Sequence, residues 1–140
     1  MKRLLKTFIL VVLSVLMCVS GFPISVAAEE NQITPRLSHI AGASFAFAAD
    51  ASGGYIDASY TGYSSKFVRA VLTVKVEKRF LLAFWNDVGT WSATSTAIDG
   101  YFTHVMSLNG SGTYRATFTL EVIGRDGTVD VVEVVRESSY

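Results

Sequence analysis

The sequence predicts an all-β protein built as a single antiparallel β-sandwich, and three observations support this fold class. Residues 67–79 and 113–123 carry apolar side chains at every second position, which is the period of a strand with one dry and one wet face. Turn-forming sequences recur about every ten residues, as in all-β sandwiches and barrels. After residue 28, no run has the spacing of an amphipathic helix. The two long one-sided strands favour a sandwich of about seven strands.

The first 28 residues have the order of parts that defines a secretory signal peptide. Three basic residues lie among the first six, an uncharged and largely apolar run covers 7–28, and small residues lead up to Ala28. We expect cleavage after Ala28. A retained membrane anchor is the alternative, because a membrane-spanning helix needs about 20 apolar residues. Gly21, Pro23 and the small residues before Ala28 favour cleavage.

Cleavage would leave a chain long enough for one domain with one core. We divide it into a flexible leader, residues 29–36, and a β-sandwich domain, residues 37–140. The only cysteine, Cys18, lies in the signal peptide, so the processed protein has no disulfide. Met17 precedes it, where lipoprotein signals have a small residue, so we expect no lipid anchor. The expected location is outside the cell, either free or retained at the envelope.

The charge of the processed chain limits its partners. Three of the twelve basic residues leave with the signal peptide, while all twelve acidic residues stay. Nucleic-acid binding normally requires a basic patch that neutralises phosphates, and none is visible. We therefore expect no nucleic-acid partner and, after cleavage, no membrane span.

The N-terminal half of the domain contains two clear strands. Residues 43–48 alternate weakly, and a turn sequence with two glycines at 50–54 separates them from a strand expected at 55–61. The strand expected at 67–79 is the longest, and we expect the rest of the sandwich to be organised around its dry face. In the strand at 55–61, one face carries Ile56, Ala58 and Tyr60. In the strand at 67–79, the dry face is expected to consist of Val68, Ala70, Leu72, Val74 and Val76.

The middle of the domain begins with an apolar run that does not alternate. Residues 80–85, Phe-Leu-Leu-Ala-Phe-Trp, are interpreted as the end of the long strand and a connection that buries several large side chains. A short strand is expected at 88–94 and another at 101–108. Asn109-Gly110 then predicts a hairpin turn, because both residue types accept the left-handed backbone conformation.

The C-terminal part contains the second long strand, at 113–123. A turn sequence at 124–127 leads to a closing strand at 128–136, which is apolar in both registers. Either both faces of that closing strand are covered, or a bulge shifts its register. The inner face of the strand at 113–123 is expected to consist of Tyr114, Ala116, Phe118, Leu120 and Val122.

Tyr114 indicates a more specific fold. It begins a late strand within Gly112-x-Tyr114-x-Ala116, which matches the tyrosine-corner position of immunoglobulin-like domains. Ala116 stands where antibody domains have a cysteine. In such a corner the tyrosine hydroxyl bonds to an upstream backbone group and stabilises the fold. We therefore expect an immunoglobulin-like sandwich.

No catalytic or metal-binding arrangement is visible in the sequence. His39 and His104 are far apart and lack a local Cys or carboxylate partner, whereas a zinc site needs three or four close ligands; we interpret both as sheet-surface histidines. There is no Gly-x-Ser-x-Gly elbow, phosphate loop or dinucleotide fingerprint. We expect no enzyme activity, no metal and no cofactor. The carboxylates that a glycosidase could use are candidates in name only: Asp57, Asp87, Asp99 and Asp130.

The aromatic residues are the candidates for binding. Trp85 and Trp91 lie close together in sequence. In a sandwich a tryptophan often fills the space between the sheets, and this structural interpretation applies to both. The alternative is an exposed platform, made by a tryptophan with Tyr60 or Tyr63, that stacks on sugars or docks a protein.

Several short motifs are spread over nearly the whole processed chain. They are Ile33-Thr-Pro-Arg36, Gly54-Tyr-Ile-Asp-Ala58, Val71-Leu-Thr-Val74, the pair Trp85 and Trp91, Gly112-Thr-Tyr-Arg115 and the terminal Tyr140. With these motifs the chain resembles the small secreted β-sandwich proteins of Gram-positive bacteria, a family of unknown function. The resemblance implies export and a β-sandwich fold, and it implies no catalytic residues.

These observations lead to one main hypothesis and two alternatives. The main hypothesis is a secreted, non-enzymatic binding module for an extracellular glycan, an envelope polymer or a protein. The first alternative is a structural surface protein that self-associates through the Val-rich edge at 129–135. The second is a secreted hydrolase with an unrecognised site. A membrane-active toxin ranks below these, because no basic amphipathic segment is present.

Overall fold

The computed structural model describes residues 37–140, and these residues form seven strands without a helix. The predicted signal peptide and leader, residues 1–36, lie outside the described part of the chain. Within that part, no helix is long and apolar enough to span a membrane. The strands are β1 (Ile40–Asp50), β2 (Gly53–Gly62), β3 (Phe67–Phe80), β4 (Phe84–Ser95), β5 (Asp99–Met106), β6 (Thr113–Gly124) and β7 (Val129–Ser139).

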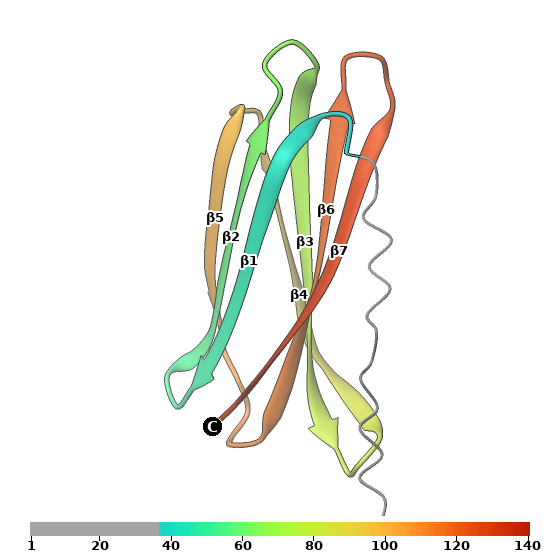
Figure 1. Ribbon diagram of the computed structural model, residues 1–140. Helices are drawn as coiled ribbons and strands as arrows, with labels where there is room; N and C mark the ends of the chain where they lie inside the picture. Colours follow the sequence, from blue (N-terminus) through green and yellow to red (C-terminus); the bar gives the residue numbers. More distant parts are fainter. Residues whose placement is uncertain (1–36) are drawn as a thin grey trace, which may run out of the picture. The chain divides into compact units, whose positions relative to one another are not determined.

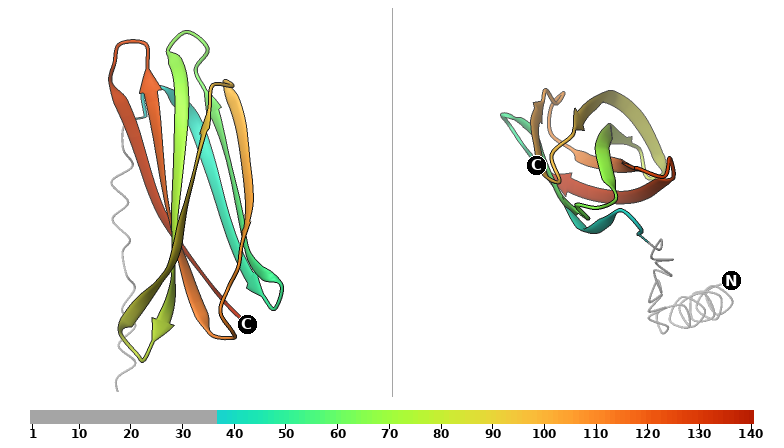
Figure 2. Two further views of the ribbon diagram at one scale, coloured as in Figure 1. Left: turned by 180° about the vertical axis from the view of Figure 1, so that it is seen from behind. Right: turned by 90° about the horizontal axis from the view of Figure 1, so that it is seen from above.

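The strands form two antiparallel sheets that face each other, which confirms the predicted all-β sandwich (Figures 1 and 2). One sheet has the order β1-β2-β5, and the other has the order β4-β3-β6-β7. Hairpins join β1 to β2, β3 to β4 and β6 to β7 within a sheet. The other three connections cross from one sheet to the other. The β3–β4 and β6–β7 hairpins therefore lie at opposite ends of the sandwich (Figure 1).

The core lies between the two sheets and is built from alternating side chains, as predicted. Every second residue of β6 is buried, and the same holds along β2 and the middle of β3. Period-two alternation points these side chains inward, where burial of apolar surface stabilises the fold. The buried apolar residues are Ile40, Phe45, Phe47, Ile56, Ala58, Tyr60, Phe67, Ala70, Leu72, Val74, Val76, Phe102, Tyr114, Ala116, Phe118, Leu120 and Val122.

The start of β3 differs from the predicted alternation. Val68 was expected on the dry face, but it is exposed, and Phe67 is buried in its place. The reason is a register shift against β6 between Phe67 and Arg69, which turns the first residue of the strand inward. Phe67 then stacks on Tyr60, with ring centroids 5.6 Å apart.

The last strand, β7, follows neither of the two predicted alternatives. It pairs with β6 in one continuous register, so no bulge explains its two apolar faces. Val132 and Val134 pack against the core, whereas Val129, Val131 and Val135 are exposed on the outer face. The outer valines are therefore surface residues of the four-stranded sheet.

The outer edge of β7 runs beside β1, and side chains join the two sheets there. The Asp130 carboxylate accepts the His39 backbone N–H at 2.7 Å. Further along, the Ser138 hydroxyl accepts the Ala49 N–H at 2.9 Å. Side chains of β7 thus satisfy backbone N–H groups along the β1 side that would otherwise be unpaired at the edge of the three-stranded sheet.

The hydrogen bonds predicted for Tyr114 are present. Its hydroxyl donates to the backbone oxygens of Asn109, at 3.0 Å, and of Gly110. The ring is fully buried and stacks on Tyr140, with centroids 6.0 Å apart. The Tyr140 hydroxyl also donates to the Gly110 oxygen, at 2.7 Å. Two tyrosines therefore hold the β5–β6 connection.

Candidate functional site

Among residues 37–140, the most exposed apolar surface is the end of the β3–β4 hairpin. We call Phe80, Leu81, Leu82, Ala83 and Phe84 the apolar tip. The four large side chains are 55%, 69%, 99% and 65% exposed, in chain order. The prediction that residues 80–85 bury several large groups was therefore wrong.

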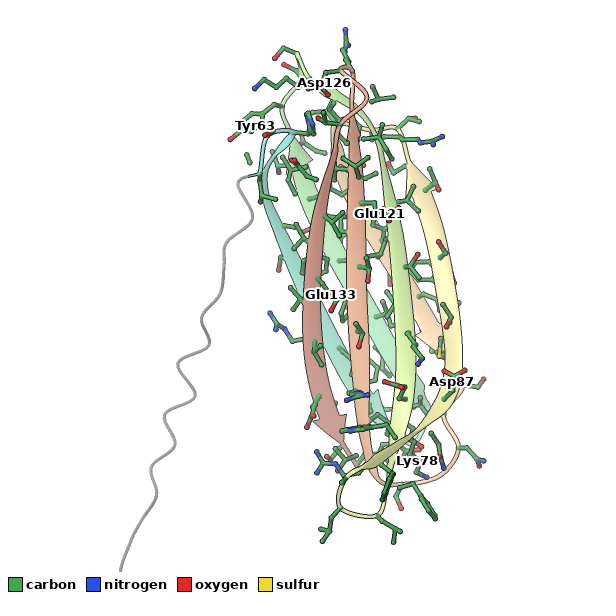
Figure 3. The ribbon with its side chains drawn as sticks, turned by 90° about the vertical axis from the view of Figure 1, so that its right-hand side faces the viewer. Tyr63, Lys78, Asp87, Glu121, Asp126 and Glu133 are labelled. Carbon is green, nitrogen blue, oxygen red and sulfur yellow. The ribbon has the colours of Figure 1, made fainter. Side chains whose placement is uncertain are left out.

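The apolar tip is exposed because β3 and β4 continue beyond their neighbours. The pairing of β3 with β6 ends at Lys78 and Tyr114. The pairing of β3 with β4 continues through Arg79 and Trp85 to Phe80 and Phe84. The last rungs therefore form a two-stranded ribbon at the end of the molecule, which is the end where Figure 3 labels Lys78.

The turn of the apolar tip has an unusual backbone. Leu81 has a φ angle of 57°, and it is the only residue other than glycine with positive φ among residues 37–140. This left-handed conformation costs an L-residue with a Cβ about 1–2 kcal/mol, whereas Gly and Asn adopt it readily. The tip thus keeps a large apolar side chain where turn chemistry favours a glycine or an asparagine.

A bulge marks the base of this ribbon. Val76 pairs with Gly89, whereas the next residue, Glu77, pairs with Asp87, so that Val88 is the extra residue of β4. A bulge of this kind bends the strand and increases its twist. It therefore turns the last rungs of the hairpin relative to the rest of the four-stranded sheet.

An aromatic and cationic layer lies directly behind the apolar tip. Trp85 is paired across the ribbon with Arg79, whose guanidinium carbon lies 4.9 Å from the centroid of the indole ring. The guanidinium carbon of Arg115, from β6, lies 4.3 Å from the same centroid. Such cation–π contacts orient the indole and both guanidinium groups.

Two glutamates hold these arginines. Arg115 Nε donates to Glu77 Oε2 at 2.7 Å, and Arg79 donates to Glu137 Oε2 at 3.2 Å. Glu77 is only 8% exposed, and it also accepts a bond from Lys75 at 3.0 Å. The hydrogen bond from Arg115, followed by that from Lys75, lowers the pKa of Glu77 below its ordinary value. Glu77 therefore stays ionised and keeps Arg115 in place.

Lys78 connects the base of the ribbon to the β5–β6 connection. Its ammonium donates to the backbone oxygens of Asn109 and Gly110. The same ammonium lies 5.4 Å from the centroid of the Tyr114 ring. The tyrosine corner and the projecting ribbon are thus parts of one supported structure.

The structure does not bring the four predicted binding residues together. Trp85 lies behind the apolar tip. Trp91 is half-buried and stacks on His104 of the other sheet, with ring centroids 4.6 Å apart and planes within 4°. Tyr60 is buried in the core and donates to the Ala97 oxygen at 2.7 Å, so it offers no surface for a ligand.

Tyr63 lies in the connection from β2 to β3, at the end of the sandwich opposite Lys78 (Figure 3). It is exposed, but Trp85 lies at the opposite end of β3, beside Arg79, and Trp91 pairs with Val74 halfway along that strand. The tyrosines therefore do not complete a platform with either tryptophan. One tryptophan stands at the end of the hairpin and the other joins the two sheets.

The histidines also lie in different surroundings. His39 was interpreted as a surface residue, but its side chain is buried against Gly124, whose missing side chain makes the space. Its Nε2 atom lies 2.7 Å from the Thr128 hydroxyl. Among residues 37–140, no group of three or more His, Cys, Asp or Glu could hold a metal ion.

The candidate carboxylates are dispersed as well. Asp57 accepts a hydrogen bond from the Tyr101 hydroxyl at 2.7 Å, which raises the pKa of that tyrosine. Asp130 accepts backbone N–H groups of the β1 side, and Asp87 lies on the ribbon. Asp57 and Asp130 therefore serve local structure in the described part of the chain.

No protein-family model matches the sequence, and no curated protein matches it.

The exposure of the apolar tip was not predicted from the sequence, although residues 80–84 have an unusual pattern. Residues 80–84 are uninterrupted by a polar group, do not alternate, and are preceded by Lys78 and Arg79. The same pattern is compatible with a strand that is buried on both faces. Only the position of the neighbouring strand β6 distinguishes the two cases.

Proposed function

We propose that this chain is an exported, non-enzymatic binding module that attaches to an apolar partner through its apolar tip. The observation that carries the proposal is the exposure of Phe80, Leu81, Leu82 and Phe84 together at one end of the sandwich. Clustered apolar side chains of this kind on a soluble protein mark interaction sites. Export is proposed from the anatomy of residues 1–28 and from the resemblance to small secreted proteins of Gram-positive bacteria.

An immunoglobulin-like classification is part of this proposal. The hydrogen bonds of Tyr114 and the crossing of the chain between a three-stranded and a four-stranded sheet support it. Domains of this architecture commonly carry their binding residues on loops at one end of the sandwich. The apolar tip lies at such an end.

The surroundings of Trp85 favour an apolar partner over a sugar. Stacking on a sugar requires a free aromatic face, whereas two guanidinium groups lie within 5 Å of the Trp85 centroid. The side chains in front of Trp85 are aliphatic or phenyl groups without hydrogen-bonding atoms. Such a surface recognises apolar area rather than hydroxyl groups.

Retention on isolated cell-wall polymer and on membrane fractions of Gram-positive cells tests the proposal. We expect Leu82→Asp to reduce retention about tenfold or more, because the change replaces the most exposed apolar group of the tip by a charge. Val131→Asp is the matched control, since Val131 is an exposed apolar residue far from the tip, on the outer face of β7. Equal retention of Leu82→Asp and the unmodified protein on every fraction would contradict docking through the tip.

Self-association through β7 is a second proposal, which the exposed valines of its outer face favour. Val129, Val131 and Val135 lie on the outer face of the edge strand, with Glu133 between the last two. The β1 strand runs beside that edge, and the β7 side chains Asp130 and Ser138 accept the backbone N–H groups of His39 and Ala49, which makes pairing with another chain less favourable. Sedimentation at rising concentration distinguishes the two: a strict monomer excludes self-assembly through β7.

A further inference from the structure

We infer that the apolar tip inserts into the interfacial layer of a phospholipid bilayer. This inference rests on the proposed function and names its partner. From the tip inward, the groups follow the order that a bilayer surface requires. Apolar side chains lie at the extreme end, an indole with two guanidinium groups lies behind them, and the rest of the sandwich with its polar surface lies behind these.

The layers follow from the rungs of the ribbon. The pair Phe80 and Phe84 closes the turn, and the pair Arg79 and Trp85 is the next rung behind it. One strand residue advances about 3.3 Å, so the tip, two to three residues deep, reaches about 5–10 Å beyond the indole. That depth matches the boundary between headgroups and acyl chains, into which interfacial segments insert.

The layer behind the apolar tip has the composition of a membrane interface. Tryptophan is enriched at the level of the headgroups, where its ring is buried and its N–H stays wet. Arginine side chains lay their apolar stems along buried surface and keep the charged group in water. The contacts of Arg79 and Arg115 with Trp85 already hold these three groups in one layer.

The neighbouring loops at this end are polar, which confines insertion to the apolar tip. The β1–β2 turn is closed by the Asp50 carboxylate, which accepts the Ser52 N–H at 2.7 Å. The β5–β6 connection consists of polar and glycine residues between Asn109 and Gly112. These groups suit a hydrated headgroup layer and not an acyl interior.

The charges around the ribbon predict only a small preference for anionic lipids. Arg115 and Lys75 bind Glu77, and Arg79 binds Glu137, so most of the positive charge is compensated. Lys78 binds backbone oxygens instead of a carboxylate. The charged groups around the ribbon are Lys75, Lys78, Arg79 and Arg115 with Glu77, Asp87 and Glu137, which leaves one positive charge in excess.

A protein partner fits this surface less well. The apolar tip has five residues and projects from the molecule, whereas a stable protein–protein interface uses about 20–30 residues on each side. A second copy of the chain would offer the same convex tip, and two convex tips bury little area against each other. A fluid bilayer adapts to a projecting group and needs no matching surface.

Trp85 supplies a local reporter for the experiment. In a Trp91→Phe background, Trp85 is the only tryptophan, and its fluorescence reports on the layer behind the apolar tip. The protein is mixed with phosphatidylcholine vesicles whose acyl chains carry bromine, which quenches indole fluorescence on contact. We expect a blue shift and quenching, and about fivefold stronger binding when half the lipid is phosphatidylglycerol. Added salt should reduce that preference.

Paired variants in the same background make the result specific. Leu82→Asp should weaken vesicle binding about tenfold or more, and Val131→Asp should leave it unchanged. Vesicle flotation of the two aspartate variants, made with both tryptophans intact, repeats the test without Trp91→Phe. Both variants keep the same N-terminal residues, so a difference between them reports on the tip.

Each result is decisive. Quenching that depends on Leu82 supports insertion. Unquenched Trp85, or binding that Leu82→Asp leaves intact, overturns the lipid inference. If vesicles do not bind while Leu82→Asp still loses retention on cell-wall polymer or forms fewer dimers in sedimentation, the partner is a protein or polymer, and docking through the tip stands. If Leu82→Asp changes neither property, the proposed function fails too.

Discussion

The two hairpins of the four-stranded sheet both reverse the chain in a tight turn, but the residues of the two turns differ in chemistry. The β6–β7 turn places Gly127 at a φ angle of 79° and is closed by Asp126, whose carboxylate accepts the Thr128 N–H at 3.0 Å. The β3–β4 turn places Leu81 at a φ angle of 57°. One turn uses the residues that turns favour, and the other keeps exposed apolar groups at a conformational cost.

This difference separates an end of the molecule whose residues stabilise the fold from an end whose apolar residues are left exposed. At the β6–β7 end, hydrogen bonds from the Thr128 hydroxyl and N–H lower the pKa of Asp126, and the buried His39 ring packs against Gly124. At the β3–β4 end, the apolar tip contributes no buried surface to the core. Residues that stabilise neither the turn nor the core are the ones available for binding.

The largest effect on stability is expected from a substitution at the base of the β6–β7 hairpin. A Cβ atom at Gly124 would overlap the His39 ring and come within 2.6 Å of Asp126 Oδ1. Because His39 is buried, we expect Gly124→Ala to lower the free energy of unfolding by about 1–3 kcal/mol. Urea denaturation measures this. Gly42→Ala is the control, since a Cβ there meets no atom within 4 Å. Equal stability of the two variants would contradict the packing of His39 on Gly124.

A smaller effect is expected at the β3–β4 hairpin, where one substitution should raise stability and weaken binding. Asparagine tolerates the left-handed conformation of residue 81, so Leu81→Asn should raise the free energy of unfolding by up to about 1 kcal/mol. The same change removes an apolar group that is 69% exposed, and it should weaken vesicle binding. Urea denaturation and vesicle flotation of one preparation measure both. A variant that is less stable and binds equally well would show that the leucine serves the fold.

The smallest expected effect concerns the support of the cationic layer by Glu77. The pKa of Glu77 is lowered below its ordinary value of 4.5, so its contribution to stability is present above that pH. The contribution is lost as the pH falls through the lower pKa of the folded state. Glu77→Gln should therefore be less stable than the unmodified protein near neutral pH, and the gap should close in acid. The effect is small because glutamine keeps one acceptor for Arg115.

Denaturation curves at neutral pH and below pH 4 test this expectation. Thr119, on the outer face of β6, offers a control in the form of Thr119→Ser, which changes no charge. A gap between Glu77→Gln and the unmodified protein that stays constant with pH would mean that the ion pairs of Glu77 add nothing to stability.

The sequence by itself determined the fold class and most of the core, because period-two alternation is a local property of an extended chain. All five predicted inner residues of β6 are buried, as are four of the five predicted for β3, and the face of β2 that carries Ile56, Ala58 and Tyr60 is the inner one. The hydrogen bonds of Tyr114 followed from its place in a short motif. These features depend on neighbours along the chain or on one strand pairing.

Only the tertiary structure decided which apolar residues stay outside. Residues 80–84 have one sequence pattern whether a sheet covers them or not, and their exposure depends on where β6 ends beside β3. The burial of His39 depends on Gly124, and the separation of Tyr63 from Trp85 depends on the path of the chain between the sheets. Contacts between segments that are distant in sequence carry no local period, and the site of this protein is defined by such contacts.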